Sequence, residues 1–573
     1  MTPGTAEQTT ASTGDTASPG GAPAEHEDAM SVALADAAHL LHLREFDTSK
    51  VDPGVLTTLM SRRNSPAETG ARLRRYLQHL IEHPISRVPD RRELWRSMLD
   101  HCDELTPLQA YAMRQLMGGA SNAGYPSLPD RIELEFPRDH RVQTDAQCGW
   151  HFLVGSLWDE DGNEYGVESM MFGFAMYPEP IAKEFGLSPL DNLSVEVQFA
   201  ISERGVRHHQ GEPLVALGTS GLIHTNDAPF EFSVGANTMT SASADDLLPL
   251  RVRTWGLDRG GDEPLELACD LTLAEGKQVL LQGDHGAMPS VGGIGTYYYS
   301  IPNISIDPSC SSIRIGDREI RIVRGQLWFD HQWGFLSGVS EHEVLRASQS
   351  IGQPDPAGWD WFMAHLEGDR QITMFAEHRN ENRDHYFDDG DEAPSPMIRR
   401  VGGTYMDEHG ATRLIWGTMT VDEWVRVEHT PRPDRYPATH TWYPNHYRFD
   451  FDDLPDDITS FTMTPIVDGG QSAFFAHGFQ ICEGAVVLRD SSGRDIGRGF
   501  AEAVAYADTL ANQLRLAGLP VTDEMLALAA EPIPDAALAA SNTEYVTTHQ
   551  DDLAAIVATS TGLPWMIEGF GAS

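Results

Sequence analysis

The sequence has very few lysines and a large excess of acidic residues. Only Lys50, Lys183 and Lys277 are lysines among 573 residues, and the formal net charge at pH 7 is −44. So negative a surface repels phosphate backbones and anionic lipid headgroups. We therefore expect no nucleic-acid partner and no charge-driven binding to a membrane surface.

Long apolar runs and closely spaced cysteines are also missing. No stretch approaches the roughly 18 uninterrupted apolar residues of a transmembrane helix. The five cysteines show no CxxC spacing, which argues against a disulfide framework and favours buried thiols in a reducing compartment. The first 27 residues contain no Lys, no Arg and no apolar run, so they do not resemble a secretory signal. The expected location is the cytoplasm.

Motifs for cofactors and metals are absent from the sequence as well. Neither a GxGxxG nor a P-loop stands between a strand and a helix, so nicotinamide and ATP are not implied. The histidine pairs, such as His378 and His385, lack the helical spacing and the carboxylate partner of a metal site. We predict no cofactor and no metal.

Helical periodicity marks both ends of the chain. Residues 1–27, rich in small and polar residues, are predicted to be a disordered tail. Residues 28–145 are predicted to be a helical extension, because residues such as Leu73, Tyr76 and Leu77 recur at helical spacing. Residues 507–573 are predicted to form C-terminal helices, packed on the β-domains or on the N-terminal helices.

Between these flanks the apolar period is two. Val195, Val197 and Phe199 alternate with polar residues, and turn pairs such as Asp161-Gly162 recur. Many short strands with hairpin turns favour antiparallel sandwiches or barrels. The segment is too long for one barrel. The prediction is therefore a mainly β protein with two tandem domains, at residues 146–310 and 311–506, and a domain boundary near residues 308–320.

Two short clusters combine aromatic and acidic residues within about 35 positions: Trp328-Phe329-Asp330-His331-Gln332-Trp333-Gly334 and Gly358-Trp359-Asp360-Trp361-Phe362. An apolar wall raises the pKa of a neighbouring carboxyl group, which keeps a protonated acid available near neutral pH. Alternation along a strand places Trp359 and Trp361 on the face opposite Asp360. By the same rule, His331 and Trp333 share one face, and Asp330 takes the other.

Several segments together resemble the carotenoid 1,2-hydratase, or AttH-like, superfamily, which also includes fungal decalin-forming Diels–Alderases. These segments are Trp150 to Leu157, Tyr297 to Ser300, Gly325 to Gly334, Gly358 to Phe362, and Gly497 to Phe500 with Glu502. The similarity spans roughly residues 147–506. It implies two lipocalin-like or sandwich-like antiparallel β-domains with a hydrophobic pocket between or within them.

The resemblance also implies roles for individual residues. Asp360 and His331 match hydratase residues proposed for acid catalysis, and Trp333 matches one that positions the substrate. His331 is then expected to hold Asp360 by a hydrogen bond or to position water. Three further aromatic residues from the similar segments are expected to bind the substrate: Trp328, Tyr298 and Trp150.

The predicted function is cofactor-free hydration of a C=C bond, or its protonation to start a cyclisation, in a hydrophobic isoprenoid or polyene. A pericyclase that folds a polyketide-like chain is one alternative. A non-catalytic carrier of a hydrophobic small molecule is another. The polar residues also have a purely structural interpretation. Asp330, His331 and Asp360 would then form a buried hydrogen-bonded network that fixes the strands. The helical flanks are expected to cap the pocket or to mediate a homodimer.

Overall fold

A computed structural model describes residues 66–82, 92–101, 132–334, 358–378, 393–429, 439–506 and 519–530, with short gaps inside these ranges and a few isolated positions elsewhere. The tail at residues 1–27 and all residues after 530 lie outside the described residues, and so does any homodimer contact there. None of the helices in the described residues is both long and apolar enough to cross a membrane.

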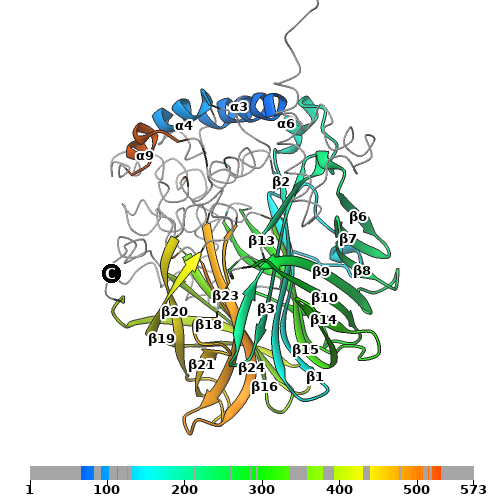
Figure 1. Cartoon of the computed structure of the whole chain (residues 1–573), viewed down its shortest axis with the longest axis vertical. Helices are drawn as coiled ribbons and strands as arrows, with labels where there is room; N and C mark the ends of the chain where they lie inside the picture. The colour runs from blue at the N-terminus through cyan, green and yellow to red at the C-terminus, as the bar shows by residue number, and fades with distance from the viewer. Residues whose placement is uncertain are drawn as a thin grey trace, which may run out of the picture.

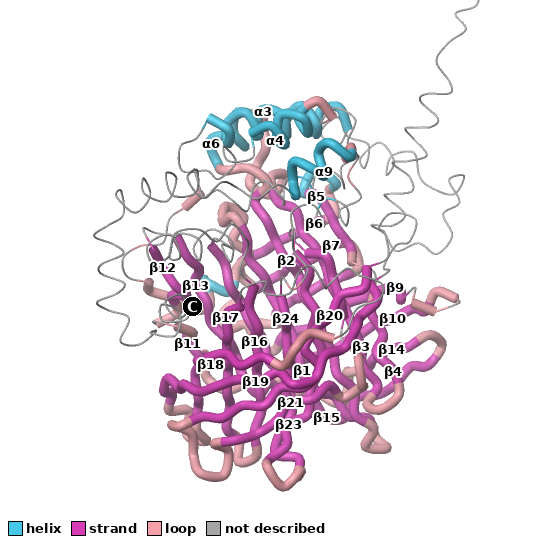
Figure 2. The backbone as a smooth tube through the Cα atoms, turned by 90° about the vertical axis from the view of Figure 1, so that its left-hand side faces the viewer, coloured by secondary structure: helices cyan, strands magenta, loops and turns pink. Residues whose placement is uncertain are grey.

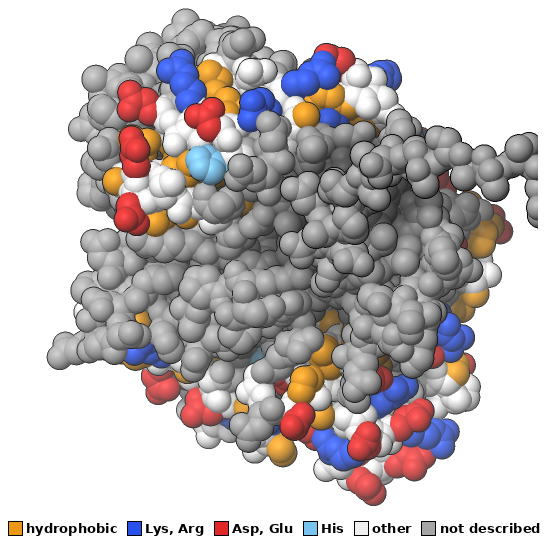
Figure 3. Space-filling view, turned by 45° about the horizontal axis from the view of Figure 1, so that its top comes forward, with side chains coloured by type: hydrophobic (Ala, Val, Ile, Leu, Met, Phe, Trp, Pro, Cys, Tyr) orange, Lys and Arg blue, Asp and Glu red, His pale blue; other side chains and the backbone are white. Residues whose placement is uncertain are grey.

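The described helices gather at one end of the molecule, above the strands (Figures 1 and 2). They are α3 (Pro66–Glu82), α4 (Arg92–Leu99), α6 (Glu179–Glu184) and α9 (Asp523–Ala530). The described residues also contain two short 3₁₀ turns, η5 (Arg138–His140) and η6 (Gly218–Ser220). α9 begins where the Thr522 hydroxyl accepts a hydrogen bond from the backbone N–H of Met525. Apolar residues of α3, α4 and α9 share one buried cluster. The described parts of the N- and C-terminal flanks therefore pack together, which is one of the two arrangements expected for the C-terminal helices. Acidic and basic side chains are intermixed on the described part of this face (Figure 3).

The first β-unit is an antiparallel sheet whose central strands are in the order β4-β3-β2-β1-β15-β14-β10-β9-β8-β7-β6, with β13 also paired to β15. Its strands are β1 (Cys148–Asp159), β2 (Glu164–Ala175), β3 (Leu193–Glu203), β4 (Arg207–Gln210), β5 (Leu214–Leu217), β6 (Ile223–Asp227), β7 (Phe230–Val234), β8 (Asn237–Ser241), β9 (Leu250–Asp258), β10 (Leu265–Leu273), β11 (Leu280–Leu281), β12 (Ala287–Val291), β13 (Ile294–Ile304), β14 (Ser312–Ile315) and β15 (Arg318–Gly334).

The second β-unit is a closed antiparallel barrel. Its strands run in the order β21-β20-β19-β18-β17-β16-β24-β23, β21 pairs with β23 to close the ring, and β22 adds to β23. They are β16 (Gly358–Leu366), β17 (Arg370–His378), β18 (Met397–Met406), β19 (Thr412–His429), β20 (Thr439–Phe451), β21 (Ser460–Pro465), β22 (Ser472–Ala476), β23 (Phe479–Asp490) and β24 (Asp495–Val504). The predicted fold class, mainly β with two tandem antiparallel units and helical flanks, is confirmed.

The chain passes from one sheet to the other downstream of the domain boundary predicted near residues 308–320. β14 and β15, at Ser312–Ile315 and Arg318–Gly334, pair with strands of the first sheet. The first strand of the barrel is β16, which starts at Gly358. The sequence around Gly316-Asp317 predicts a turn, but it does not indicate which sheet the following strand joins. The choice of sheet depends on the pairing of β15 with β1, which is distant in the sequence.

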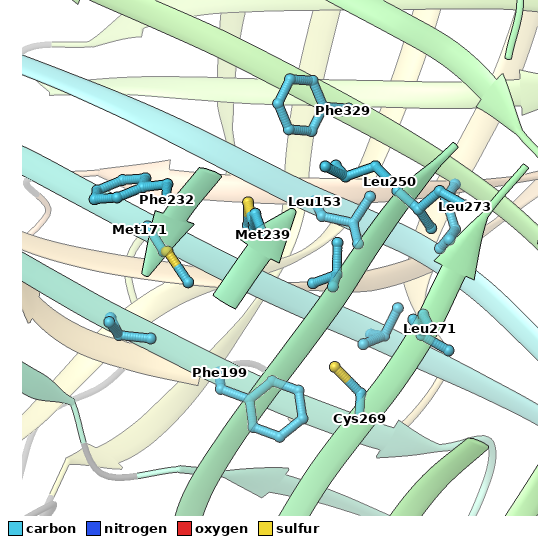
Figure 4. Close-up of a cluster of buried hydrophobic side chains, with 14 of the residues drawn as sticks. Leu153, Met171, Phe199, Phe232, Met239, Leu250, Cys269, Leu271, Leu273 and Phe329 are labelled. Atoms are coloured by element: carbon cyan, nitrogen blue, oxygen red, sulfur yellow. The ribbon is translucent and has the colours of Figure 1, made fainter. Parts of the chain in front are cut away.

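Each unit has its own apolar core. In the first, residues such as Leu153, Met171 and Phe329 point to one side of the sheet and meet residues of β7 to β10 (Figure 4). In the barrel, residues such as Phe362 and Phe449 point inward, with ring centroids 5.0 Å apart. The opposite faces of β1, β2 and β15 lie against β16, β23 and β24. We call this buried contact between the two units the seam.

Candidate functional site

The residues predicted to form the site lie in three separate places. Asp360 points into the barrel, where it is fully buried. His331 and Trp333 point into the core of the first unit. Trp328 and Tyr298 lie in the seam, on the other face of the strands that carry His331 and Tyr299.

Asp360 is held by two side chains at one end of the barrel. Arg399 Nη1 donates a hydrogen bond of 2.8 Å to Oδ2, and the Tyr506 hydroxyl lies 2.9 Å from Oδ1 and 3.1 Å from Oδ2. Burial raises the pKa of Asp360 to about 6, against the opposing effects of Arg399 and Tyr506. A carboxyl group with this pKa changes its charge close to neutral pH.

Aromatic rings surround this end of the barrel. The rings of Trp424 and Tyr443 both meet the Tyr506 ring edge-on, with centroids 5.8 Å away. The indole Nε1 of Trp424 is buried and has no hydrogen-bond acceptor among the described residues. A buried N–H without a partner is costly, so this atom indicates a place where an oxygen atom would be bound.

The expected contact between His331 and Asp360 is not formed. His331 Nδ1 donates a hydrogen bond of 2.8 Å to the backbone oxygen of Trp150 instead. The imidazole ring is stacked between the rings of His151 and Trp333, with centroid distances of 3.9 Å and 4.5 Å. Burial holds the pKa of His331 well below its usual value, so the ring is neutral. Strand alternation explains the separation, because β15 points His331 away from the barrel. The catalytic role of His331 stays a prediction.

Trp333 is likewise part of the core of the first unit. Its ring stacks on Tyr297, with centroids 4.8 Å apart and an interplanar angle of 8°. The predicted pairing of His331 and Trp333 on one face is confirmed. Their predicted position beside the substrate is not tested by these contacts.

The seam contains a hydrogen-bonded network around Asp330. Its carboxylate accepts bonds from Trp328 Nε1 at 2.6 Å, from the Tyr298 hydroxyl at 2.5 Å and from the Ser300 hydroxyl. Trp361 Nε1, from the barrel, donates to the Tyr298 oxygen at 3.0 Å. Burial raises the pKa of Asp330 to about 7, although the three donors favour the ionised form. The network therefore joins the two units. It differs from the predicted one, because neither His331 nor Asp360 takes part.

Trp150 lies farther along the seam, half-buried, with its ring centroid 4.9 Å from that of Phe172. Glu502 on β24 faces the same contact and accepts a hydrogen bond of 2.8 Å from Trp359 Nε1. Burial raises the pKa of Glu502 to about 7. Thus three of the predicted substrate-binding residues, Trp150, Trp328 and Tyr298, share the seam with two carboxyl groups.

Sequence reasoning missed several residues of these places. Arg399 carried no signal, because its pairing with Asp360 depends on two strands that are not neighbours in the sheet. Trp424 stands after a bulge in β19, so its direction did not follow from alternation. Tyr506 and Glu502 stood in segments with family resemblance but received no role. Within the described ranges, no group of three His, Cys, Asp or Glu side chains is arranged to hold a metal ion.

A family model described as AttH-like matches residues 127–506. The chain belongs to the AttH-like family. The matched residues include all strands of both β-units and exclude α3, α4 and α9. Of the described helices at that end of the molecule, only α6 therefore lies within the residues that match the family.

Two solved structures are similar to this AttH-like protein. One is a protein assigned as AttH from Nitrosomonas europaea, with 19% identity and a TM-score of 0.45, covering 66% of this chain and 99% of its own. The other is kievitone hydratase from Nectria haematococca, with 12% identity and a TM-score of 0.39, covering 67% of this chain and 98% of its own. No curated protein matches the chain.

Proposed function

We propose that this AttH-like protein adds water to a C=C bond of a hydrophobic molecule such as an isoprenoid, with Asp360 as the proton donor and without a cofactor. The supporting observation is the position of Asp360, a fully buried carboxyl group with a pKa of about 6 at an aromatic end of the barrel. A general acid works best when its pKa lies near the working pH.

The neighbours of Asp360 suit this chemistry. The protonated carboxyl group gives its proton to one alkene carbon, which leaves a cation on the other carbon and a negative charge on Asp360. Arg399 and Tyr506 are already placed to stabilise that charge. The faces of aromatic rings such as Tyr443 stabilise a cation. Water then forms the C–O bond, and its surplus proton returns to Asp360.

Trp424 supports this proposal, because its indole N–H can donate a hydrogen bond to the oxygen of a water molecule. Its buried indole N–H lacks an acceptor, and its ring adjoins Tyr506. A water oxygen bound there would stand beside the residue that contacts Asp360. This arrangement favours hydration over protonation alone.

The test compares wild-type protein with Asp360→Asn in heavy-oxygen water, using lycopene and a solvent extract of cell lipids as substrates and mass spectrometry as the readout. The wild type is expected to form products that gain labelled water. Asp360→Asn is expected to form them about 10²- to 10⁴-fold more slowly, the usual contribution of a general acid. Ligand binding, followed by tryptophan fluorescence, should change little.

The matched control is Asp330→Asn, which removes the buried carboxyl group of the seam instead. Loss of hydration in this variant with an unchanged rate in Asp360→Asn would move the reaction to the seam. Unlabelled isomers of the substrate would indicate a cyclase. Binding without any product would indicate a carrier.

A further inference from the structure

The outer face of the first β-unit carries a hollow whose lining lies outside the seam and the barrel. Cys269 and Leu271 of β10 point into the core of that unit (Figure 4), so Ala268 and Asp270, which alternate with them, point outward. Ala268 and Asp270 line a hollow of about 180 Å³, which we call the outer hollow. The volume suits one aromatic ring, since a protein cavity of about 150 Å³ binds benzene.

Strand register explains the shape of the outer hollow. Trp255 on β9 pairs with Ala268, and Ala268 pairs with Arg314 on β14, so the smallest of three adjacent side chains is in the middle. Side chains two strands apart stand roughly 9.6 Å from each other. A flat ring in van der Waals contact on both faces needs about 7–8 Å. The row therefore has room for a planar group between an indole ring and a guanidinium group, two partners that stack on aromatic rings.

The arginines of the outer hollow have hydrogen-bond donors that are not in use. Arg253 donates from Nε to Asp270 Oδ2 at 3.2 Å, and neither of its Nη groups has an acceptor among the described residues. Arg314 donates from Nη1 to Glu266 Oε1 at 2.8 Å, which leaves its Nε and Nη2 groups. Ser312, which pairs with Asp270, adds a hydroxyl group to the lining. These donors suit an anionic oxygen.

The carboxylate of the outer hollow is already held in ion pairs. Asp270 accepts hydrogen bonds of 2.8 and 2.7 Å from Arg251, besides the one from Arg253. The hydrogen bond from Arg251 is the largest cause that lowers the pKa of Asp270, so this group is ionised at neutral pH. It holds the Nε edge of Arg253 and leaves the two Nη groups for another acceptor. A guanidinium group that is already oriented loses less entropy on binding an anion.

Glu319 is the charged group of the lining that opposes an anion. It pairs with Arg314 in the strand register, and it has no ion-pair partner among the described residues. More distant charges matter less, because salt screens exposed charges beyond about 10 Å. The arginines beside the outer hollow therefore outweigh the formal net charge of −44 at this place.

We propose that the outer hollow is a binding site for a small planar aromatic carboxylate. The ring lies on Ala268 between Trp255 and Arg314, and the carboxylate accepts hydrogen bonds from the Nη groups of Arg253. The site is independent of Asp360 and of the proposed hydration. The core of the first unit and the seam both lie between the outer hollow and the barrel, and β9, β10 and β14 are on the far side of the molecule from β18 to β21 (Figure 1).

The test is a titration of the full-length wild type with benzoate, followed by saturation-transfer NMR of the ligand. Benzoate is expected to bind. Benzamide, which lacks the charge, and cyclohexanecarboxylate, which lacks the flat ring, should each bind at least about 5-fold more weakly. Sodium chloride should weaken benzoate binding, because the ion pair is partly exposed. Equal affinities for benzoate and benzamide, or no binding of benzoate up to about 10 mM, would overturn the proposal.

Substitutions locate the site. Ala268→Leu fills the outer hollow and should abolish benzoate binding. Thr240→Leu is the matched control, since Thr240 pairs with Arg251 on the same face but lies outside the lining, and its affinity should equal that of the wild type. Arg253→Gln should weaken binding about 10-fold, and Glu319→Gln should strengthen it about 2- to 3-fold by removing a like charge.

Circular dichroism checks that each variant is folded. A folded Ala268→Leu variant that binds benzoate as the wild type does would place the ligand elsewhere and contradict the proposal. If Ala268→Leu does not fold, the two exposed positions decide. Equal affinities of the wild type, Arg253→Gln and Glu319→Gln would then overturn the site.

Discussion

Arg399 sets the acidity of Asp360 from a strand that is distant from β16 in sequence. Its guanidinium group stabilises the ionised carboxylate, which lowers the pKa of Asp360 and makes it a stronger acid than burial alone would allow. Alkenes are weak bases, so this greater acidity favours the proposed proton transfer. The buried ion pair is consistent with a role in the reaction, since such pairs contribute little net stability to a fold.

Arg399→Gln should therefore change both the rate and its pH dependence. Removing the positive charge raises the pKa of Asp360, so the decline in hydration rate with rising pH should move to higher pH. The maximal rate should fall roughly 10- to 100-fold, because a hydrogen bond to a charged group contributes about 1.5–3 kcal/mol. The measurement is a pH–rate profile.

Arg400→Gln is the matched control, since Arg400 is next on β18 and its side chain is exposed. Its profile should coincide with that of the wild type. An Arg399→Gln profile with the same pH midpoint as wild type would show that Arg399 does not act on the catalytic acid.

At this scale the sequence predicted the local directions of side chains well. The aromatic clusters lie on strands, and alternation correctly placed Trp361 opposite Asp360, and His331 with Trp333. It was not possible to predict which side chains meet across strands. The expected contact of His331 with Asp360 failed because the two strands belong to different sheets.

Among the elements, β2 shows how closely the two units approach. Its even-numbered residues face the seam, and there Gly166 lies against Ala485. Gly173 is on the same strand, and a Cβ there would meet its nearest atom at an ordinary 3.5 Å. A methyl group at Gly166 would therefore clash with the other unit, whereas a methyl group at Gly173 would fit without a clash.

Gly166→Ala should destabilise the protein by about 1–3 kcal/mol, because the added methyl group overpacks the seam. Gly173→Ala should be neutral or slightly stabilising, since alanine loses less backbone entropy on folding than glycine does. Denaturant unfolding of both variants gives the comparison. Equal free energies of unfolding for the two variants would mean that the contact between the units accommodates the added methyl group without loss of stability.

The elements themselves were largely visible in the sequence. Helical spacing around Leu73 predicted α3, and alternation at Val195 predicted β3. The domain boundary expected near residues 308–320 falls in the hairpin of β14 and β15, and both strands pair with the first sheet. A hairpin looks the same in a sequence whether its second strand stays in one sheet or begins another. Whether the two units are independent folding domains stays a prediction.

For the whole molecule, ion pairs fasten the two units at one end of the seam. Glu164 on β2, whose side chain is 5% exposed, binds Arg204 in its own unit and Arg498 on β24. Asp495 in turn contacts Arg204, Arg489 and Arg498. On another side, Lys277 of the first unit contacts Asp369 of the barrel.

Glu164→Gln should weaken the union of the units. The variant loses charge on a buried carboxylate that accepts bonds from two arginines, so we expect a loss of about 1–3 kcal/mol in the free energy of unfolding. Glu367→Gln is the control, because its pair with Arg494 lies within the barrel and both side chains are 55% exposed. That variant should change little. Similar small losses of unfolding free energy in both variants would show that the ion pairs of Glu164 are not needed to hold the two units together.

The proposed reaction depends most on the proton of Asp360. The most direct measurement is the rate at which heavy oxygen from water enters products formed by the wild type and by Asp360→Asn. The account predicts labelled products with the wild type and a loss of at least about 10²-fold in the variant. Labelled products formed at equal rates by both proteins would contradict it.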